Sequence, residues 1–498
     1  MSFTGGSNRP RMWPVAGFEQ FMLADDSRRY PMVFWVKATF AGRVDEDRLR
    51  RAFEHTVLTQ PLLRSRLCHR LLGLRCGLKW REDFITKAHF DVSPKGTPLN
   101  LPPGKNLAID LKKEPGVRLF VREDEVSSEW YLQLHHSVSD GTGGFRFVEQ
   151  LLTSYERSLT ENLDVEDALF AKPGLSQMFP KRGKFGLSLW QIIRRLPTDL
   201  KSTLDYYAFR PRPLAKIKPI SEKKLGEQQN ALPASVNYTF NTASIAALKK
   251  TALAWSATLN DLLIRDLFLT LDRFNKSGYT SRKLRICMPV NLRPMLSESL
   301  PVANIMGMCG IDRSGLELDD PYQLMTTIAA ETRKIKSERL ALAINFIPAP
   351  VSYTHLVLTA AMKRPGYWKC VATAVLSNLG YTFKTDKFRR NQSGQTVVDN
   401  LTLLRLELLP PVKIATNIAI GVVTYNGEMT LSLHYDRTVL STSDANTILA
   451  DYVTELSRSI MLTADSDIEV QGSNLGFEFG GRATASHLVK TQLPSLTN

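Results

Sequence analysis

Two adjacent histidines lie in a short segment whose residue types are suited to acid–base chemistry. Residues 135–141 read His-His-Ser-Val-Ser-Asp-Gly. A neutral imidazole accepts protons near neutral pH, so His136 could deprotonate a hydroxyl or an amine as that group attacks a carbonyl carbon. Asp140 could orient the imidazole or pair with a distant cation, and Gly141 permits backbone angles that other residues avoid. We therefore predict that His136 is a general base.

A strand and a helix are expected to position this segment. Trp130, Leu132 and Leu134 alternate with polar residues, which predicts a strand over 129–135 that ends at the histidine pair. The glycine-rich turn over 141–144 then leads into a helix with an apolar stripe. A histidine at the end of a strand, beside such a turn, can face a cleft while its backbone is held rigidly.

The same residues admit other interpretations. A lone histidine pair is usually no more than the end of a strand, and His135, His136 and Asp140 could also bind a metal ion. No further cluster of His, Cys or Asp completes such a site in the sequence, so we predict no metal. His434 and Asp436 stand at another expected strand end, and we interpret both as structural.

The rest of the chain alternates strands and helices in two rounds. The Asn-Gly pair at 426–427 is the strongest two-residue signal for a β-hairpin, because both positions need positive φ. The patterns predict strands at 32–41, 117–122, 236–240, 284–290, 418–424 and 429–435, and helices beginning at Asp45, Ser244, Thr258, Asp320 and Ser443. Strands and helices mixed in this way favour two α/β sandwich domains, each with two layers.

The expected domain boundaries follow the change in composition along the chain. We assign 1–171 to an N-terminal domain that carries the histidine motif and 230–465 to a C-terminal domain. A basic, proline-rich crossover over 172–229 joins them, and a polar tail occupies 466–498.

The net charge of +15 is concentrated in that crossover. Residues 172–224 hold thirteen Lys or Arg against three Asp or Glu, so the rest of the protein is nearly balanced. No nucleic-acid-binding signature accompanies the charge, so we expect no nucleic acid and instead a phosphate-bearing cofactor or an anionic membrane surface. Residues 184–196 have a helical apolar stripe, and we expect 181–196 either to pack on the protein itself or to contact a membrane peripherally.

The cysteine spacing and the apolar segments indicate in which cellular compartment the protein is expected. The five cysteines have no C-x-x-C spacing and are expected to be reduced. The N-terminus lacks the apolar segment of a signal peptide, and the longest apolar region, 340–362, is interrupted by prolines and polar residues. We expect a cytoplasmic protein, either soluble or peripheral to a membrane.

The motif resembles the His-His-x-x-x-Asp-Gly signature of the CoA-dependent acyltransferase superfamily. That group includes chloramphenicol acetyltransferase, condensation domains, wax ester synthases, alcohol acetyltransferases and polyketide-associated acyltransferases. Further segments look like parts of the same family: the unit ending at 61–64 (Pro-Leu-Leu-Arg), Ala-Thr-Leu-Asn-Asp at 257–261, Met-Pro-Val-Asn-Leu-Arg-Pro at 288–294 and Ser-Asn-Leu-Gly at 377–380. The resemblance runs from about residue 15 to 463.

This resemblance implies a fold and a set of roles. Two chloramphenicol-acetyltransferase-like domains would form a V-shaped pseudo-dimer with a central tunnel, which makes a monomer the default. His136 would be the base and His135 a neighbour of lesser role. Asp140 would pair with an arginine of the second domain, for which Arg293 is the candidate. The main chain near Gly141 or a hydroxyl such as Ser377, next to Asn378, would stabilise an oxyanion.

Three functions stay open on these grounds. The first is an O-acyltransferase that moves an acyl group from acyl-CoA to an alcohol by direct attack, with no permanently bound cofactor. The second is a stand-alone condensation enzyme that uses the thioester of a phosphopantetheinyl carrier protein to form an amide or an ester. The third, of another class, is a non-catalytic relative that binds acyl chains or proteins, although it would not need His136. The sequence leaves the acyl chain length and the choice between an alcohol and an amine acceptor open.

Overall fold

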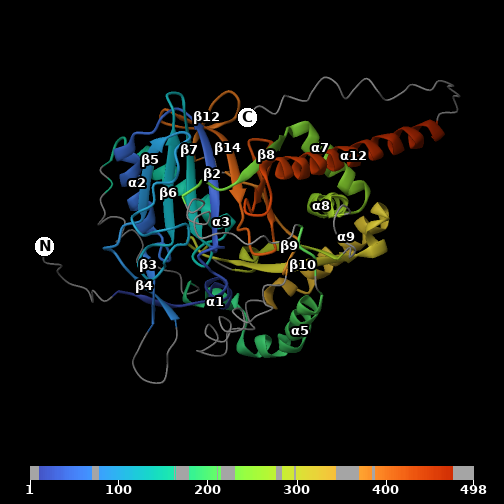
Figure 1. Ribbon diagram of the computed structural model, residues 1–498, viewed down its shortest axis with the longest axis horizontal. Helices are drawn as coiled ribbons and strands as arrows, with labels where there is room; N and C mark the ends of the chain where they lie inside the picture. The colour runs from blue at the N-terminus through green and yellow to red at the C-terminus, as the bar shows by residue number, and fades with distance from the viewer. Residues whose placement is uncertain are drawn as a thin grey trace.

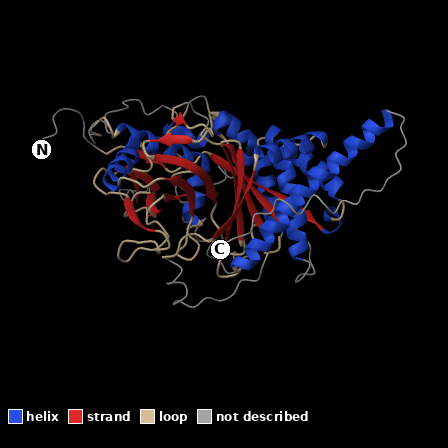
Figure 2. Ribbon diagram, turned by 90° about the horizontal axis from the view of Figure 1, so that it is seen from above, coloured by secondary structure: helices blue, strands red, loops and turns tan. Residues whose placement is uncertain are grey.

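Two mixed β-sheets form the centre of the molecule, and most helices lie outside them (Figures 1 and 2). The computed structural model describes residues 10–69, 78–161, 163, 179–209, 211–214, 230–275, 283–296, 299–343, 370–383 and 387–474. This arrangement confirms the expected fold class, a mixed α/β protein with two lobes.

The first sheet places the histidine motif at the end of a central strand. Its strands are, in spatial order, β12 (Arg389–Arg390), β13 (Thr396–Val398), β14 (Leu401–Leu409), β2 (Val33–Ala41), β7 (Ser127–His135), β6 (Val117–Glu123) and β5 (His89–Pro94). Helices α2 (Glu46–Thr59) and α3 (Gly141–Arg157) pack together on one face through the rings of Phe53 and Phe147. Asp45 caps α2 as predicted, because its side chain accepts a hydrogen bond from the Arg48 N–H.

The second sheet is built from the C-terminal half of the chain. Its strands are β10 (Met306–Ser314), β9 (Lys283–Asn291), β11 (Ala374–Tyr381), β15 (Ile418–Tyr425), β16 (Glu428–Tyr435) and β8 (Ser235–Phe240). Its helices are α7 (Thr242–Ala254), α8 (Leu259–Asn275), α9 (Pro321–Ser337) and α12 (Thr442–Asn474). The predicted hairpin is confirmed: Asn426 and Gly427 both have positive φ, at 49° and 79°, between β15 and β16.

The strands of residues 230–465, expected to form a separate C-terminal domain, do not all belong to the second sheet. Strand β14 pairs antiparallel with β2, so that Leu406 stands opposite Ala38 and the chain returns to the first sheet before it completes the second. The two sheets come close there, because a Cβ on Gly421 of β15 would lie only 2.0 Å from the Leu408 carbonyl oxygen. Alternation within a strand predicts its faces but not its hydrogen-bonding partner, so this crossing could not be predicted from pattern alone.

Four short elements, three strands and one helix, were not predicted. Strands β1 (Met12–Pro14), β4 (Leu78–Glu82) and β3 (Ser65–His69) form a small sheet of their own. Helix α1 (Gly17–Ala24) follows β1, and its Phe18, Phe21 and Met22 pack with Met306 of β10. Helix α1 therefore contacts the second sheet although it belongs to the N-terminal half.

The crossover differs from the expected helix over 184–196. Residues Phe179–Lys184 form the 3-10 helix η1, and α5 begins later and runs further, over Leu189–Ala208. Ser188 starts α5 with a capping box, since its side chain accepts from the Gln191 N–H while the Gln191 side chain accepts from the Ser188 N–H. Short 3-10 turns also occur at η2 (Arg293–Met295), η3 (Gly315–Leu318) and η4 (Leu340–Leu342).

The structure describes only part of the predicted crossover and part of the predicted tail. Of the crossover 172–229, the structure describes 179–209 and 211–214, and the rest lies outside the described residues. Helix α12 continues to Asn474, so the predicted tail is helical at its start, while 475–498 lie outside the described residues.

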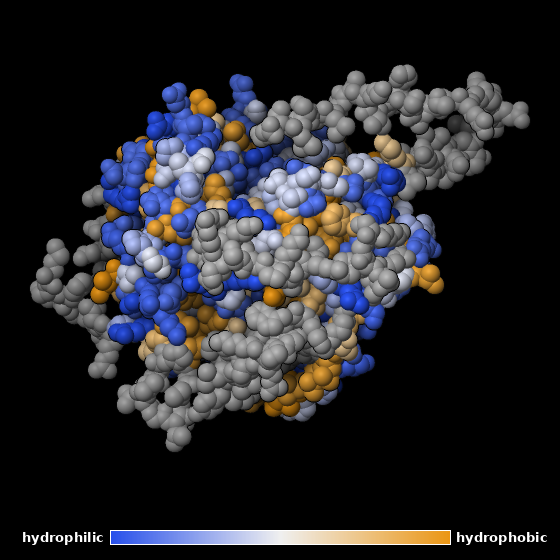
Figure 3. Space-filling view, viewed as in Figure 1, coloured by the Kyte–Doolittle hydropathy of each residue, from blue (hydrophilic) through white to orange (hydrophobic). Residues whose placement is uncertain are grey.

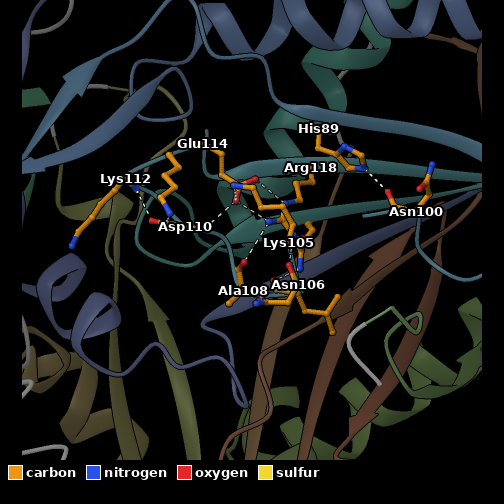
Figure 4. Close-up of polar contacts among 12 residues, drawn as sticks. His89, Asn100, Lys105, Asn106, Ala108, Asp110, Lys112, Glu114 and Arg118 are labelled. Atoms are coloured by element: carbon orange, nitrogen blue, oxygen red, sulfur yellow. Dashed lines mark hydrogen bonds and ion pairs between the residues drawn. The ribbon is translucent and has the colours of Figure 1, made fainter. Parts of the chain in front are cut away.

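A buried arginine holds the long connection between the parallel strands β5 and β6 (Figure 4). Arg118 is fully buried, and its guanidinium donates to both carboxylate oxygens of Glu114 and to the carbonyl oxygens of Asn106 and Ala108. A buried charge is stable only when it is paired and fully hydrogen-bonded, so this network fixes the connection against the sheet.

Candidate active site

His136 is the first residue after strand β7 and is fixed through its main chain. Its N–H donates to the Met32 carbonyl oxygen at 2.8 Å, and its own carbonyl oxygen accepts from Asn304 Nδ2 at 2.6 Å. The imidazole lies against the ring of Phe34, with 5.0 Å between the ring centroids. The main-chain N–H and carbonyl of His136 and one face of its ring are therefore held, and the side chain has little freedom to move.

The environment of His136 favours its neutral form. Burial lowers the pKa of the imidazole, and the charge of Asp140 and hydrogen bonds with the main chain at His136 and Ser139 oppose that shift without cancelling it. Asn304 Nδ2 also lies 3.4 Å from His136 Nδ1. A neutral imidazole is the form that can accept a proton.

His135 has different surroundings. The Ser137 N–H donates to its Nδ1 at 3.1 Å, and the Ser137 hydroxyl lies 2.8 Å from the same nitrogen. Its Nε2 lies 3.7 Å from Asp26 Oδ2, and the side chain is almost completely buried. Nδ1 is therefore hydrogen-bonded within the protein, and Nε2 lies near a carboxylate.

Asp140 uses its carboxylate to join three segments. Oδ1 accepts from the Gly143 N–H at 2.8 Å and so caps helix α3. Oδ2 accepts from Arg293 Nη1 at 2.7 Å and from the Ile305 N–H at 2.8 Å. Burial alone would raise the pKa of Asp140, but the charge and hydrogen bonds of Arg293 and the two N–H donors lower it overall. The pairing of Arg293 with Asp140, expected from the resemblance, is present.

A cavity of about 250 Å³ lies at His136, between the two sheets. Both halves of the chain contribute to its wall, which is mostly apolar and rich in methionine: Phe21, Met22, Met32, Val290, Met306 and Met308. His136, Asp140, Gly141 and Thr142 line it from the first half, and Arg293, Ser377 and Asn378 line it from the second. The structure thus brings all the predicted site residues except His135 to one cavity.

Gly141 and Ser377, the residues expected to stabilise an oxyanion, both line the cavity at His136. A Cβ on Gly141 would lie 2.9 Å from Leu379 Cδ1, so only glycine fits there without a shift of the β11 side chain. Gly141 is also the first residue of α3, where main-chain N–H groups have no partner within the helix. Nothing among the described residues forms a hydrogen bond with the Ser377 hydroxyl, whereas the Asn378 side chain is used to accept from the Gly380 N–H.

Asn304 was not predicted to belong to the site. Its side chain reaches from the segment before β10 to the carbonyl oxygen of His136. Asparagines are common in loops, and no sequence period indicates which one faces a histidine on a distant strand. Asn291 lines the cavity, and its side chain accepts from the Arg293 N–H.

His434 and Asp436 lie at a second, smaller cavity of about 120 Å³, which Tyr30 also lines. His434 Nδ1 donates to the Pro410 carbonyl oxygen at 2.6 Å, and Asp436 Oδ2 accepts from the Tyr30 hydroxyl at 3.0 Å. Both side chains thus hold neighbouring segments together. No group of three or more His, Cys, Asp or Glu side chains suited to a metal ion occurs within the described ranges.

Comparisons with known proteins define the fold. The chain resembles trichothecene 15-O-acetyltransferase from Fusarium sporotrichioides, with a TM-score of 0.65 and 12% identity over 92% of this chain and 97% of that one. It also resembles the first condensation domain of the calcium-dependent antibiotic synthetase, with a TM-score of 0.59 and 14% identity over 91% and 97% of the two chains. The protein therefore has the two-lobed fold of condensation domains and chloramphenicol-acetyltransferase-like enzymes.

Sequence similarity is more distant. Two uncharacterised proteins from strains of Mycobacterium tuberculosis are 23% identical over 332 residues, which cover 66% of this chain and 72% of theirs. No protein-family model matches the chain.

Proposed function

We propose that the protein is an acyltransferase that moves an acyl group from a thioester to an alcohol, with His136 as the general base. The observation that carries the proposal is a buried histidine, fixed by its main chain on the wall of a mostly apolar cavity to which both halves of the chain contribute, where burial lowers the pKa of the imidazole. An apolar wall suits the acyl chain, and exclusion of water protects the thioester from hydrolysis.

The proposed reaction has a single displacement. His136 takes the hydroxyl proton as the acceptor oxygen attacks the thioester carbon, and the carbonyl electrons move onto oxygen to give a tetrahedral intermediate. When the intermediate collapses, the C–S bond breaks and the protonated imidazole returns the proton to the leaving thiolate. Since Nδ1 is the nitrogen nearest Asn304, we assign Nε2 as the nitrogen that faces the acceptor.

In this proposal, two groups stabilise the negative charge of that intermediate. The main chain at Gly141 lies at the N-terminus of α3, where the helix dipole favours an anion. The Ser377 hydroxyl lines the same cavity from β11. A donor of this kind contributes ~10²–10³ in rate when it is aimed at the oxyanion. Asp140 acts in this proposal as a positioning residue, because Arg293 and two main-chain N–H groups already occupy its oxygens.

Acyl-CoA is the proposed donor and an alcohol the proposed acceptor. The similarity in fold to a trichothecene 15-O-acetyltransferase supports an oxygen acceptor. The similarity to a condensation domain supports the second candidate, in which the donor is a carrier-protein thioester and the product is an amide or an ester. A non-catalytic acyl-binding role is the third, and the buried neutral His136 weighs against it.

The test is thiol release from acyl thioesters, measured with a thiol-reactive dye. Short and long acyl-CoAs and an acyl-loaded carrier protein are each combined with a panel of alcohols and amines. We expect release that depends on the acceptor and falls ~10²-fold or more in His136→Ala. His135→Ala is the matched control and should retain more activity than His136→Ala. Equal release by wild type and His136→Ala would overturn the mechanism, and release from the carrier alone would favour the condensation candidate.

A further inference from the structure

Helix α5 exposes a continuous apolar face that no described part of the protein covers. Six large apolar side chains on this one helix are exposed to solvent, at spacings that return to the same side every turn: Leu189, Trp190, Ile193, Leu196, Leu200 and Leu204. Leu189 and Trp190 are 73% and 71% exposed, and Leu204 is 61% exposed. Figure 3 shows hydrophobic surface gathered at the lower edge of the molecule, where Figure 1 places α5. A surface helix normally turns such a face inward.

Polar side chains hold the other side of α5 against the body. Arg195 donates to the buried Asp199 and to the carbonyl oxygens of Glu338 and Arg339 at the end of α9. The Tyr206 carbonyl oxygen accepts from Arg285, whose guanidinium lies 3.8 Å from the centroid of the Tyr206 ring. The helix is therefore attached through charged and polar groups while its apolar face points away from the protein.

Basic side chains flank the apolar face. Arg194 and Lys201 are exposed, lie seven residues apart on the same flank of the helix, and have no ion-pair partner among the residues that the structure describes. Lys181 and Lys184 of η1 are also exposed, whereas Asp205 is the exposed acidic residue of α5. Together, η1 and α5 carry four exposed basic residues and one exposed acidic residue, and this excess of positive charge favours an anionic partner.

We infer that α5 binds the surface of a membrane that contains anionic lipids. An apolar face beside basic residues is the pattern of a helix that lies in the interface, with its apolar side among the acyl chains and its basic flank at the headgroups. Trp190 suits this position, because tryptophan concentrates at membrane–water interfaces. No helix in the described part of the chain is long and apolar enough to cross a bilayer, so the contact is peripheral.

Helix α5 contacts residues that line the cavity at His136. The Tyr206 hydroxyl lies 3.4 Å from Cys287 Sγ and donates to the Val371 carbonyl oxygen, and Cys287 and Val371 both line the cavity at His136. A bilayer bound at α5 would lie beside the wall of the cavity, where an apolar substrate would be concentrated. The inference itself concerns binding and does not depend on the proposed function.

The experiment is flotation of the full chain with vesicles of phosphatidylcholine alone or of an equimolar mixture with phosphatidylglycerol. We expect binding to the anionic vesicles, reduced about tenfold or more in Trp190→Glu/Leu200→Glu because the apolar face is lost. Arg194→Glu/Lys201→Glu should reduce binding by a similar factor at low salt, because basic residues near an anionic surface contribute most of the preference for it. Leu253→Glu/Leu316→Glu is the matched control, since both leucines are highly exposed but lie on α7 and η3.

Three results would overturn the inference. Failure of the wild type to float with anionic vesicles is the first, and binding that all variants retain is the second. The third is a wild-type dimer that Trp190→Glu/Leu200→Glu dissociates, because the face would then belong to a second copy of the chain. Circular dichroism and thermal unfolding check that each variant is folded, and all substituted side chains are exposed, so loss of fold is not expected.

Discussion

The carboxylate of Asp140 lies 2.7 Å from the guanidinium of Arg293, and this buried ion pair joins the two halves of the chain beside His136. Asp140 stands at the start of α3, and Arg293 follows β9 of the second sheet. Arg293 also donates to the Ala303 carbonyl oxygen, one residue before Asn304. The pair therefore fixes both the loop that carries His136 and the segment that holds its carbonyl.

Replacing Arg293 should destabilise the protein and impair transfer together. Arg293→Ala leaves the Asp140 carboxylate buried without its cation, which costs about 3–5 kcal/mol. Denaturant unfolding measures this loss, and thiol release measures the activity. Arg157→Ala, which breaks the exposed pair with Glu161, is the control and should cost at most about 1 kcal/mol. Similar costs for the two variants would show that the Asp140–Arg293 pair does not brace the interface.

Asn304→Asp should move the acid limb of the pH–rate profile to higher pH. A carboxylate beside His136 Nδ1 stabilises the imidazolium, so the pKa of His136 rises and the base becomes protonated at a higher pH. Asn304→Ala introduces no charge and should reduce kcat without a comparable shift, since the contacts of Asn304 Nδ2 with the His136 carbonyl oxygen and with Nδ1 are lost but no carboxylate is added. The profile of kcat/KM against pH separates the two effects. Identical profiles for wild type and Asn304→Asp would argue that His136 is not the titrating base.

Gly421→Ala should be costly because the two sheets touch at this residue. The added Cβ would lie 2.0 Å from the Leu408 carbonyl oxygen, and neither backbone can yield without disturbing its sheet. We expect a loss of about 3 kcal/mol or more in the free energy of unfolding. Gly104→Ala is the control: Gly104 has a positive φ of 73° but open space around it, so backbone strain alone costs about 1–2 kcal/mol there. An equal loss at both positions would refute the close contact.

His434 should make folding stability depend on pH. Burial lowers the pKa of His434 from 6.5 to about 4. Between those values the unfolded chain binds the proton and the folded chain does not, so stability is complete above pH 6.5 and falls as the pH decreases toward about 4. At 1.36 kcal/mol per unit, the loss amounts to about 3 kcal/mol. His434→Asn keeps a donor for the Pro410 carbonyl and should remove this part of the dependence, as measured by denaturant unfolding across that range. The same pH dependence in both proteins would contradict the assignment.

Most elements could be predicted from the sequence because their signals are local. The alternation of Trp130, Leu132 and Leu134 indicated β7, the Asp45 cap indicated the start of α2, and Asn426-Gly427 indicated the hairpin. Residue types and spacing also made His136 a candidate general base, since a motif at a strand end is a feature of the chain itself. Helix α1 was not predicted, because its position depends on packing against Met306 of a distant strand.

The sequence by itself determined the strands and helices that have a clear period or cap, and it identified one histidine pair as the candidate for acid–base chemistry, because both depend on neighbours within a few positions. Only the tertiary structure decided that β14 returns to the first sheet, that Asn304 holds the carbonyl of His136, and that α5 turns its apolar face outward. Those outcomes depend on contacts between segments more than a hundred residues apart, and periodicity contains no information about which distant segments will meet.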